Sequence, residues 1–241
     1  MDIKVLASGS SGNCYLVEDG KSRLLLDAGI RYSQILAGCD FNMDEIWGCL
    51  VTHIHKDHSK AVEELIRRGI KVYGPLKMAV QIENVKPLRA LKKVSFGTFT
   101  VTPFMADHDV ACYGYHIESV ATGEKLVYLT DTARIPMIFK DINYWLIEAN
   151  YDIDIMDRNV DQGMDIKRAN RVIGTHLGID QLEDYLDELD TSMANAIYLC
   201  HLSADNSNAE DFRQRIQRVT GAPVYIAGGD DIDADRAAGG L

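Results

Sequence analysis

Residues 52–58, Thr-His-Ile-His-Lys-Asp-His, constrain the fold of this chain more than any other stretch. Three of the seven histidines and one carboxylate lie within six consecutive residues. The apolar run 47–51 before the stretch is typical of a strand, and the apolar positions 61, 62, 65 and 66 after it have helical spacing. We therefore expect a loop between a strand and a helix. In such a loop His53 and His55 point the same way, whereas Asp57 and His58 face a second point nearby.

This arrangement favours two metal ions side by side over one closed site. Imidazole and carboxylate groups bind zinc, and they also suit iron and manganese, so the spacing leaves the element open. A solvated histidine-rich loop and a lone structural metal site are the alternatives. Four ligand-type side chains at this spacing favour the two-metal interpretation over both.

The composition is that of an ordinary globular protein. With 241 residues, 46% hydrophobic and 25% charged, the chain can bury a substantial core. No apolar run reaches the ~18 residues of a membrane span, and the first residues lack a signal-peptide pattern. Five widely spaced cysteines predict reduced, mostly buried thiols. We expect a cytoplasmic protein that acts away from the membrane, and no obligate protein partner is evident.

The charge is uneven along the chain. The net charge of −11 argues against a surface coated in basic residues for nucleic acid. Between Lys60 and Lys93, however, nine Lys or Arg residues stand against three Asp or Glu. This run is either a local basic face beside the site or an ordinary solvated surface.

Further ligand-type residues follow predicted strands. His108 comes after the strand 98–104, Asp131 after the strand 125–129, and His201 after the strand 196–200. Asp27 ends the second strand of a predicted hairpin (14–18 and 23–27), where it either orients a ligand histidine or caps a turn. The recurrence of a strand followed by such a residue predicts one convergent site on a sheet-based scaffold.

The rest of the chain predicts alternating strands and helices. Strands are expected at 3–7, 71–73, 144–150 and 223–227, and helices over 59–69, 76–85 and 182–189 and after a cap at Ser207 or Asn208. The Gly/Ser loop 8–13 matches neither a P-loop nor a dinucleotide fingerprint. The acidic stretch 151–165 is expected to be an irregular surface loop, and His176 to lie in a glycine-bounded loop over 174–178. We expect one domain over 1–227 and a disordered acidic tail over 228–241.

With these residues in view, the chain resembles the metallo-β-lactamase-fold hydrolases over about residues 3–227. The resemblance is carried by the order of the metal-type residues: His53, His55, Asp57 and His58, then His108, Asp131 and His201. The chain is most similar to the YycJ-like (WalJ-like) branch in the segments 6–13, 25–29, 148–150 and 201–206.

The resemblance implies an α/β (α+β) fold, a four-layer αβ/βα sandwich with the metals at one edge. It implies that His53, His55 and His108 hold the first metal, that Asp57, His58 and His201 hold the second, and that Asp131 bridges them. The implied cofactors are two divalent metal ions, zinc or manganese, with iron as a third option. His176 resembles the loop histidine that phosphodiesterase members place near the scissile phosphate.

Two segments depart from the pattern of the branch, which has a histidine where this chain has Tyr151 and Gly-His-Leu-Ser where it has Thr175-His176-Leu177-Gly178. Both departures affect the surroundings of the expected metal ligands. The 70 residues from Asp131 to His201 leave no room for the large inserted domain of RNase J-type nucleases.

The sequence thus predicts a dinuclear metal-dependent hydrolase, a phosphodiesterase or nuclease acting on DNA or RNA through a metal-bridging hydroxide. Asp57 would orient the nucleophile and His176 would protonate the leaving group. The alternatives are a small-molecule hydrolase (thioesterase, lactonase or cyclic phosphodiesterase), which the acidic net charge favours, and a non-catalytic metal-binding module.

Overall fold

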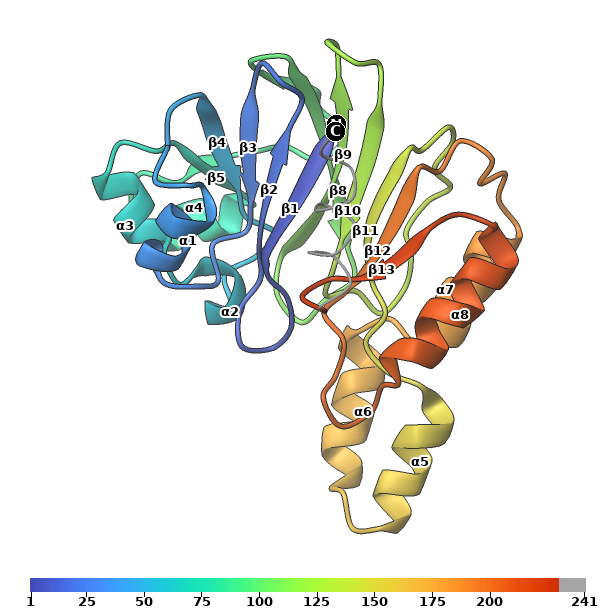
Figure 1. The fold of residues 1–241 in the computed structure, drawn as a ribbon. Coiled ribbons are helices and arrows are strands. Elements are labelled where there is room, and N and C mark those ends of the chain that lie inside the picture. The colour runs from blue at the N-terminus through green and yellow to red at the C-terminus, as the bar shows by residue number, and fades with distance from the viewer. Residues whose placement is uncertain (230–241) are drawn as a thin grey trace.

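Two β-sheets pack face to face in the computed structural model, and helices cover the outer face of each sheet (Figure 1). The structure describes residues 1–229. The arrangement confirms the predicted four-layer αβ/βα sandwich within a single domain. Most of the tail predicted over 228–241 lies outside the described residues.

The first sheet begins antiparallel, over β1 to β3, and continues parallel. Its strands, in spatial order, are β1 (Asp2–Ala7), β2 (Cys14–Glu18), β3 (Arg23–Leu26), β4 (Ile46–Leu50), β5 (Val72–Gly74) and β6 (Lys86–Pro87). The helices between them are α1 (Tyr32–Gly38), α2 (Lys56–Ser59), α3 (Val62–Arg67) and α4 (Leu76–Gln81).

The second sheet has the same two halves: its strands are antiparallel from β7 to β10 and parallel from β10 to β13. They are β7 (Val94–Phe96), β8 (Phe99–Ala106), β9 (Cys112–Ser119), β10 (Lys125–Leu129), β11 (Tyr144–Glu148), β12 (Ala196–Cys200) and β13 (Val224–Ile226). The remaining helices are α5 (Ile153–Asp161), α6 (Ile166–Thr175), α7 (Ile179–Asp187) and α8 (Ala209–Thr220).

The hydrophobic core has three layers because each sheet is covered on both faces. On β2, Tyr15 and Val17 pack between the sheets, while Cys14 and Leu16 pack under the helices of the first half. Successive residues of a strand point to opposite faces, so a strand buried on both sides is apolar throughout. A third layer, which includes Trp145 of β11, lies beneath α7 and α8.

A polar contact joins the two sheets at the edge that carries the β2–β3 turn. Asp19 accepts hydrogen bonds from the backbone N–H groups of Lys21 and Ser22, at 3.0 and 2.9 Å. Its second oxygen accepts from the hydroxyls of Thr98 and Ser119, both at 2.6 Å. Partial burial raises the pKa of Asp19, but these four hydrogen bonds together lower it by more than burial raises it. The net shift of the pKa is downward.

The prediction of a surface loop over 151–165 is wrong, because most of this segment forms α5. The Asp152 carboxylate accepts from the N–H groups of residues 154 and 155 and caps this helix. Ile153, Met156 and Val160 are spaced as on one helix face and pack in a small apolar cluster with Ala169 of α6. The high acidic content of the segment lies on the other faces of α5 and concealed this spacing.

The expected loop around His176 is also wrong in part, since α6 runs through Gly174 to Thr175 and His176 is the residue that ends it. The helix expected over 59–69 is two helices, α2 and α3, and Asp57 and His58 lie in α2. α4 ends at Gln81, four residues before its predicted end. α8 begins at a cap formed by Asn208, one of the two predicted caps.

The five cysteines are unpaired and buried, which confirms the prediction for the thiols. Within residues 1–229, no helix combines the length and the apolarity that a membrane span requires.

Candidate metal centre

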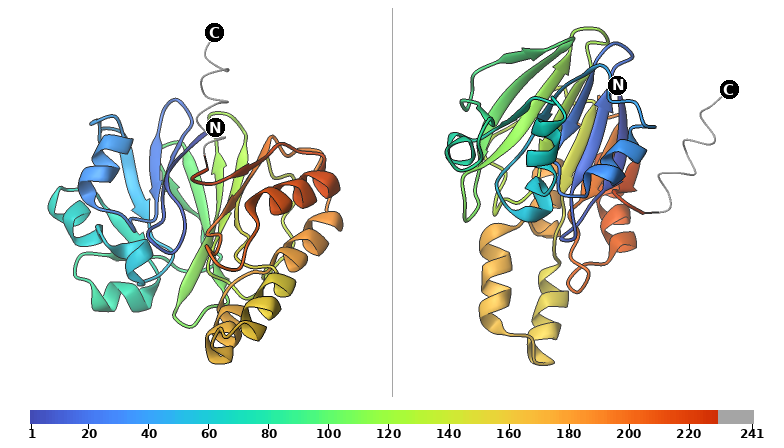
Figure 2. Two further views of the ribbon diagram at one scale, coloured as in Figure 1. Left: turned by 60° about the horizontal axis from the view of Figure 1, so that its bottom comes forward. Right: turned by 90° about the vertical axis from the view of Figure 1, so that its left-hand side faces the viewer.

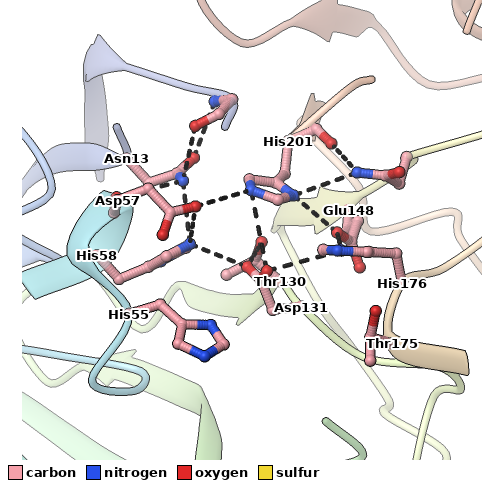
Figure 3. Close-up of polar contacts among 12 residues, drawn as sticks. Asn13, His55, Asp57, His58, Thr130, Asp131, Glu148, Thr175, His176 and His201 are labelled. Atoms are coloured by element: carbon pink, nitrogen blue, oxygen red, sulfur yellow. Dashed lines mark hydrogen bonds and ion pairs between the residues drawn. The ribbon is translucent and has the colours of Figure 1, made fainter. Parts of the chain in front are cut away.

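The carboxyl ends of several strands meet at one edge of the sandwich and carry the polar residues found there. β4 leads into His53 and His55, β8 into His108, β10 into Asp131, and β12 into His201. Figure 3 shows Asp57 and His58 from the first half of the molecule turned toward Asp131 and His201 from the second. The structure thus brings together every residue for which the sequence predicted metal binding.

The first group of ligand-type atoms comes from His53, His55 and His108, whose ligand atoms lie within 4.8 Å of one another. His53 is fully buried, and its Nδ1 lies 3.0 Å from the Thr52 hydroxyl. His108 Nδ1 lies 3.0 Å from the Thr175 carbonyl, so its Nε2 faces His55. Both of these rings are held through one nitrogen, and the other nitrogen is directed into the site.

The second group is formed by Asp57, His58 and His201, whose ligand atoms also lie within 4.8 Å of one another. Asp131 lies between the two groups: its carboxylate is 3.0 Å from His58 Nε2, 3.8 Å from His201 Nε2 and 4.0 Å from His108 Nε2. This is the position expected of a carboxylate that contacts two cations.

Two buried nitrogens within these groups have no hydrogen-bond partner among the described residues: His53 Nε2 and His201 Nε2. A buried polar atom without a partner costs about 1–3 kcal/mol. Since both atoms point into clusters of imidazole and carboxylate, a cation is the partner that fits the donor set. The residues present therefore suit a pair of metal ions.

Asp27 holds His58 in place. Its carboxylate is 2.7 Å from His58 Nδ1 and accepts hydrogen bonds from the Thr52 N–H at 2.7 Å and from the Tyr128 hydroxyl at 2.5 Å. Of the two roles considered for Asp27, the structure supports orientation of a site histidine. A carboxylate at Nδ1 fixes the tautomer that leaves Nε2 free to bind a metal.

The backbone around α2 is held by the turn after β3 and by the Gly/Ser loop. The Asn13 N–H donates to the Asp57 carbonyl at 2.7 Å, and the Ala28 N–H donates to the His58 carbonyl at 2.8 Å. A Cβ at Gly29 would lie 1.6 Å from the Asp57 carbonyl oxygen, so only glycine fits there. The Gly/Ser loop thus supports the ligand loop, a role the sequence did not reveal.

Glu148 is a site residue that the sequence analysis did not identify, as is Asn13, whose amide nitrogen lies 3.1 Å from His58 Nε2. Glu148 is fully buried at the end of β11, and one of its oxygens lies 2.8 Å from His176 Nδ1 and 2.9 Å from His201 Nδ1 (Figure 3). The other oxygen accepts from the N–H groups of Thr132 and Leu177, at 3.1 and 3.0 Å. One carboxylate therefore orients two histidines that approach from different segments.

The electrostatics of the site favour positive charge. Burial opposes the charged form of His201, but Asp131, Asp57 and Glu148 raise its pKa to about 10. Burial raises the pKa of Asp57, yet His201 and His58, whose Nε2 atoms lie 3.6 and 3.5 Å from the carboxylate, bring it well below its usual range. The Asp57 carboxylate is therefore held ionised, as a cation site requires. Burial is also the main cause that lowers the pKa of His53, which keeps this imidazole neutral and able to bind a metal.

Three site residues have left-handed backbone conformations: Asp27 (φ 57°), Asp131 (φ 53°) and His201 (φ 55°). Such a conformation costs a non-glycine residue about 1–2 kcal/mol. Each of the three directly follows or nearly follows a strand, where the turn aims its side chain into the site. Three of the nine non-glycine residues with positive φ within residues 1–229 thus belong to the site, and backbone strain of this kind occurs at functional sites.

The two departures noted in the sequence lie against each other. Tyr151 forms an isolated parallel bridge with Gly178, and a Cβ at position 178 would lie 3.0 Å from the Tyr151 ring. The tyrosine ring occupies the space that a serine side chain would need. The absence of a side chain at position 178 therefore compensates for the larger ring at position 151.

This fold and this edge site define the class: the chain belongs to the metallo-β-lactamase-fold family that includes the WalJ and YycJ proteins. It is 30% identical to "Exodeoxyribonuclease WalJ" of Streptococcus pneumoniae serotype 2 over 228 residues, which cover 86% of this chain and 83% of that protein. It is 29% identical to "Exodeoxyribonuclease YycJ" of Bacillus anthracis over 239 residues, covering 91% and 89% of the two chains.

A comparison with a solved structure supports the fold, and a family profile matches the first third of the chain. The solved structure of the metallo-β-lactamase-fold protein YhfI from Bacillus subtilis matches with a TM-score of 0.69 at 17% identity, over 93% of this chain and 95% of that one. A family profile described as "Anti-Pycsar protein Apyc1" matches residues 6–88. These residues include most of the first sheet and its ligand loop.

Proposed function

We propose that the protein is a dinuclear metal-dependent phosphodiesterase that degrades DNA from its ends. The observation that carries the proposal is the pair of adjoining ligand groups joined by Asp131. The WalJ and YycJ relatives are named as exodeoxyribonucleases, which supports DNA as the substrate. RNA is the alternative nucleic acid.

In this proposal His53, His55 and His108 would hold one divalent cation and Asp57, His58 and His201 would hold the other, with Asp131 between the two groups. Zinc and manganese suit these ligands, and iron is the third option. The cations supply Lewis-acid stabilisation of the phosphoryl oxygens and make water a stronger nucleophile at neutral pH.

The protein's own residues contribute orientation and proton transfer. Asp57 is ionised and lies 3.5 Å from His58 Nε2 and 3.6 Å from His201 Nε2, where its carboxylate can accept a hydrogen bond from the attacking water. Glu148 holds His176 through Nδ1, which leaves the other nitrogen free. Burial lowers the pKa of His176, but the neighbouring Glu148 carboxylate raises it by more than burial lowers it. The net shift is upward, so the ring can carry a proton for the leaving oxygen.

The test removes one residue from each part of the site. His55→Ala and Asp131→Ala should each abolish cleavage of labelled DNA, while circular dichroism remains that of the unaltered fold. Exposed Glu188→Gln is the matched control and should retain full activity. Retained DNA cleavage in both site variants would rule out the two-metal proposal.

A small-molecule hydrolase of the same fold is the second candidate, because the net charge of −11 opposes association with nucleic acid. A thioester, a lactone and a cyclic nucleotide, assayed beside DNA, separate the two. Turnover of one of these compounds without DNA cleavage would favour the second candidate.

A further inference from the structure

A hairpin of two helices projects beyond the sandwich beside the candidate metal centre. Figures 1 and 2 show α5 and α6 extending past the edge of both sheets at which the site residues gather. α6 is joined directly to the site: the carbonyl of its last residue, Thr175, lies 3.0 Å from His108 Nδ1, and His176 follows. A polymer bound along α6 would therefore extend toward the site.

The half of the hairpin nearer its turn contacts the segment that follows His201. The Arg168 guanidinium pairs with the Asp205 carboxylate at 2.8 Å. Asn159 of α5 donates hydrogen bonds to the Asp205 carbonyl and to the Asn206 side chain, both at 2.9 Å. An apolar cluster packs the two helices against each other, and the contacts of Arg168 and Asn159 join them to the segment after His201.

One exposed face of α6 carries positive charge toward the site. Lys167, Arg171 and Gly174 are four and three residues apart, so they lie on one side of the helix. Lys167 makes no ion pair within residues 1–229. Arg171 lies 3.8 Å from Asp109, whose carboxylate is also 3.2 Å from His108 Nε2 and 3.5 Å from His55 Nε2. Arg171 thus reaches the rim of the first ligand group.

The partner that Arg171 now has is easily exchanged. Both members of the pair with Asp109 are more than a third exposed, and such surface pairs contribute about 0–1 kcal/mol. A guanidinium binds phosphate through two parallel hydrogen bonds and therefore prefers it to a distant, solvated carboxylate.

Gly174 itself adds no side chain to this face between Arg171 and His176. A Cβ at Gly174 would meet no heavy atom within 4 Å, so the space beside the helix backbone is open. A chain that contacts Lys167 and Arg171 can pass over Gly174 to reach His176. The other helix of the hairpin lacks such a stripe: α5 carries three aspartates, at 154, 157 and 161, and the single cation Arg158.

We propose that the Lys167–Arg171–Gly174 face of α6 binds the phosphate backbone of the DNA strand that enters the metal centre. The proposal rests on the proposed nuclease function and adds to it the path of the substrate. Lys167 and Arg171 hold phosphates on the side of the scissile bond that lies toward the hairpin, and they thereby favour polymers over small diesters.

The first experiment measures binding of a fluorescein-labelled single-stranded DNA 20-mer to the full chain in EDTA, where cleavage is off. The variants are Lys167→Ala, Arg171→Ala and the double variant, and Arg158→Ala on α5 is the control of equal charge change. Each α6 substitution should weaken binding about tenfold, as loss of a charge-assisted hydrogen bond does. The slope of log K against log salt should fall by about 0.7 for each cation removed.

The second experiment compares cleavage of the same 20-mer with cleavage of bis-p-nitrophenyl phosphate by the metal-loaded proteins. The preference for DNA should fall at least tenfold in the double variant and should stay unchanged in Arg158→Ala. If the unaltered protein cleaves DNA and the double variant matches it in affinity, salt slope and preference, the α6 proposal is wrong and the nuclease function stands. If the unaltered protein neither binds nor cleaves DNA, both are wrong.

Discussion

Replacing Glu148 by glutamine tests how the site is organised, because this one carboxylate serves four donors. Two are the backbone N–H groups of Thr132 and Leu177, and two are the Nδ1 atoms of His176 and His201. Glutamine has the same shape, but it offers one accepting oxygen and one donating amide group. It can satisfy one pair of donors only.

Each orientation of the new side chain has a definite cost. If the amide oxygen faces the histidines, two buried N–H groups lose their acceptor, at about 1–3 kcal/mol each. If the amide group faces the histidines, both must accept a hydrogen bond at Nδ1, and His201 then carries its proton on Nε2, the atom directed at the metal. We therefore expect Glu148→Gln to lower the free energy of unfolding by about 2–6 kcal/mol, or to weaken metal binding by about 10–100-fold.

Urea denaturation of the metal-free protein measures the first effect, and competition with a chromophoric chelator measures the second. Nitrogen NMR of the imidazole rings distinguishes the two orientations through the His201 tautomer. Glu188→Gln, at the exposed residue that ends α7, is the control and should change neither quantity. If Glu148→Gln kept both the stability and the metal affinity of the unaltered protein, the proposed role of Glu148 would be wrong.

Three further predictions follow from contacts elsewhere in the structure. Asp27→Asn should weaken binding of metal near His58 by about 10–100-fold in the same chelator competition, and an unchanged affinity would count against its orienting role. Gly178→Ser should lower the free energy of unfolding by about 1–3 kcal/mol, and adding Tyr151→His should restore much of it; strictly additive effects would contradict the proposed compensation. Asp19 has a pKa below its unfolded value of about 3.9, so the stability it adds is present above that pH and is lost as the pH falls through the folded-state pKa. Asp19→Asn should therefore destabilise at pH 7 and destabilise progressively less as the pH falls below about 3.9, as a series of urea titrations would show; an effect independent of pH would contradict this role.

The candidate metal ligands could be predicted from the sequence because each ligand-type residue follows a predicted strand. The spacing of His53, His55, Asp57 and His58 is hard to produce by chance, and parallel strands bring their carboxyl ends to one edge. His108, Asp131 and His201 each follow an apolar run, so their convergence could be inferred from the order of strands and ligand-type residues alone.

Glu148 could not be assigned in the same way. A glutamate after a buried strand has the same local pattern whether it binds a metal, caps a turn or orients histidines, and only the contacts with His176 and His201 distinguish these roles. A signal was present, because Glu148 ends a strand as the expected ligands do. The contact between Tyr151 and Gly178 likewise joins positions whose packing no local pattern encodes.

The helical hairpin was missed for a compositional reason. Charged residues dominate α5 and α6, and the few apolar positions that follow helical spacing, such as Met156 and Ala169, bury only a small cluster. Helix formation here depends on packing between the two helices and on the cap at Asp152. A profile of hydrophobicity along the sequence shows neither the packing nor the cap.

The measurement that tests the central claim most directly is an end-labelled DNA assay with protein stripped of metal by EDTA and then loaded with manganese or zinc. We expect stepwise release of nucleotides from DNA, dependent on added metal, absent in Asp131→Ala and strongly reduced in His176→Ala. A thioester and a lactone, tested in parallel, should remain intact. Turnover of either compound by metal-loaded protein that leaves DNA and RNA uncut would contradict the account.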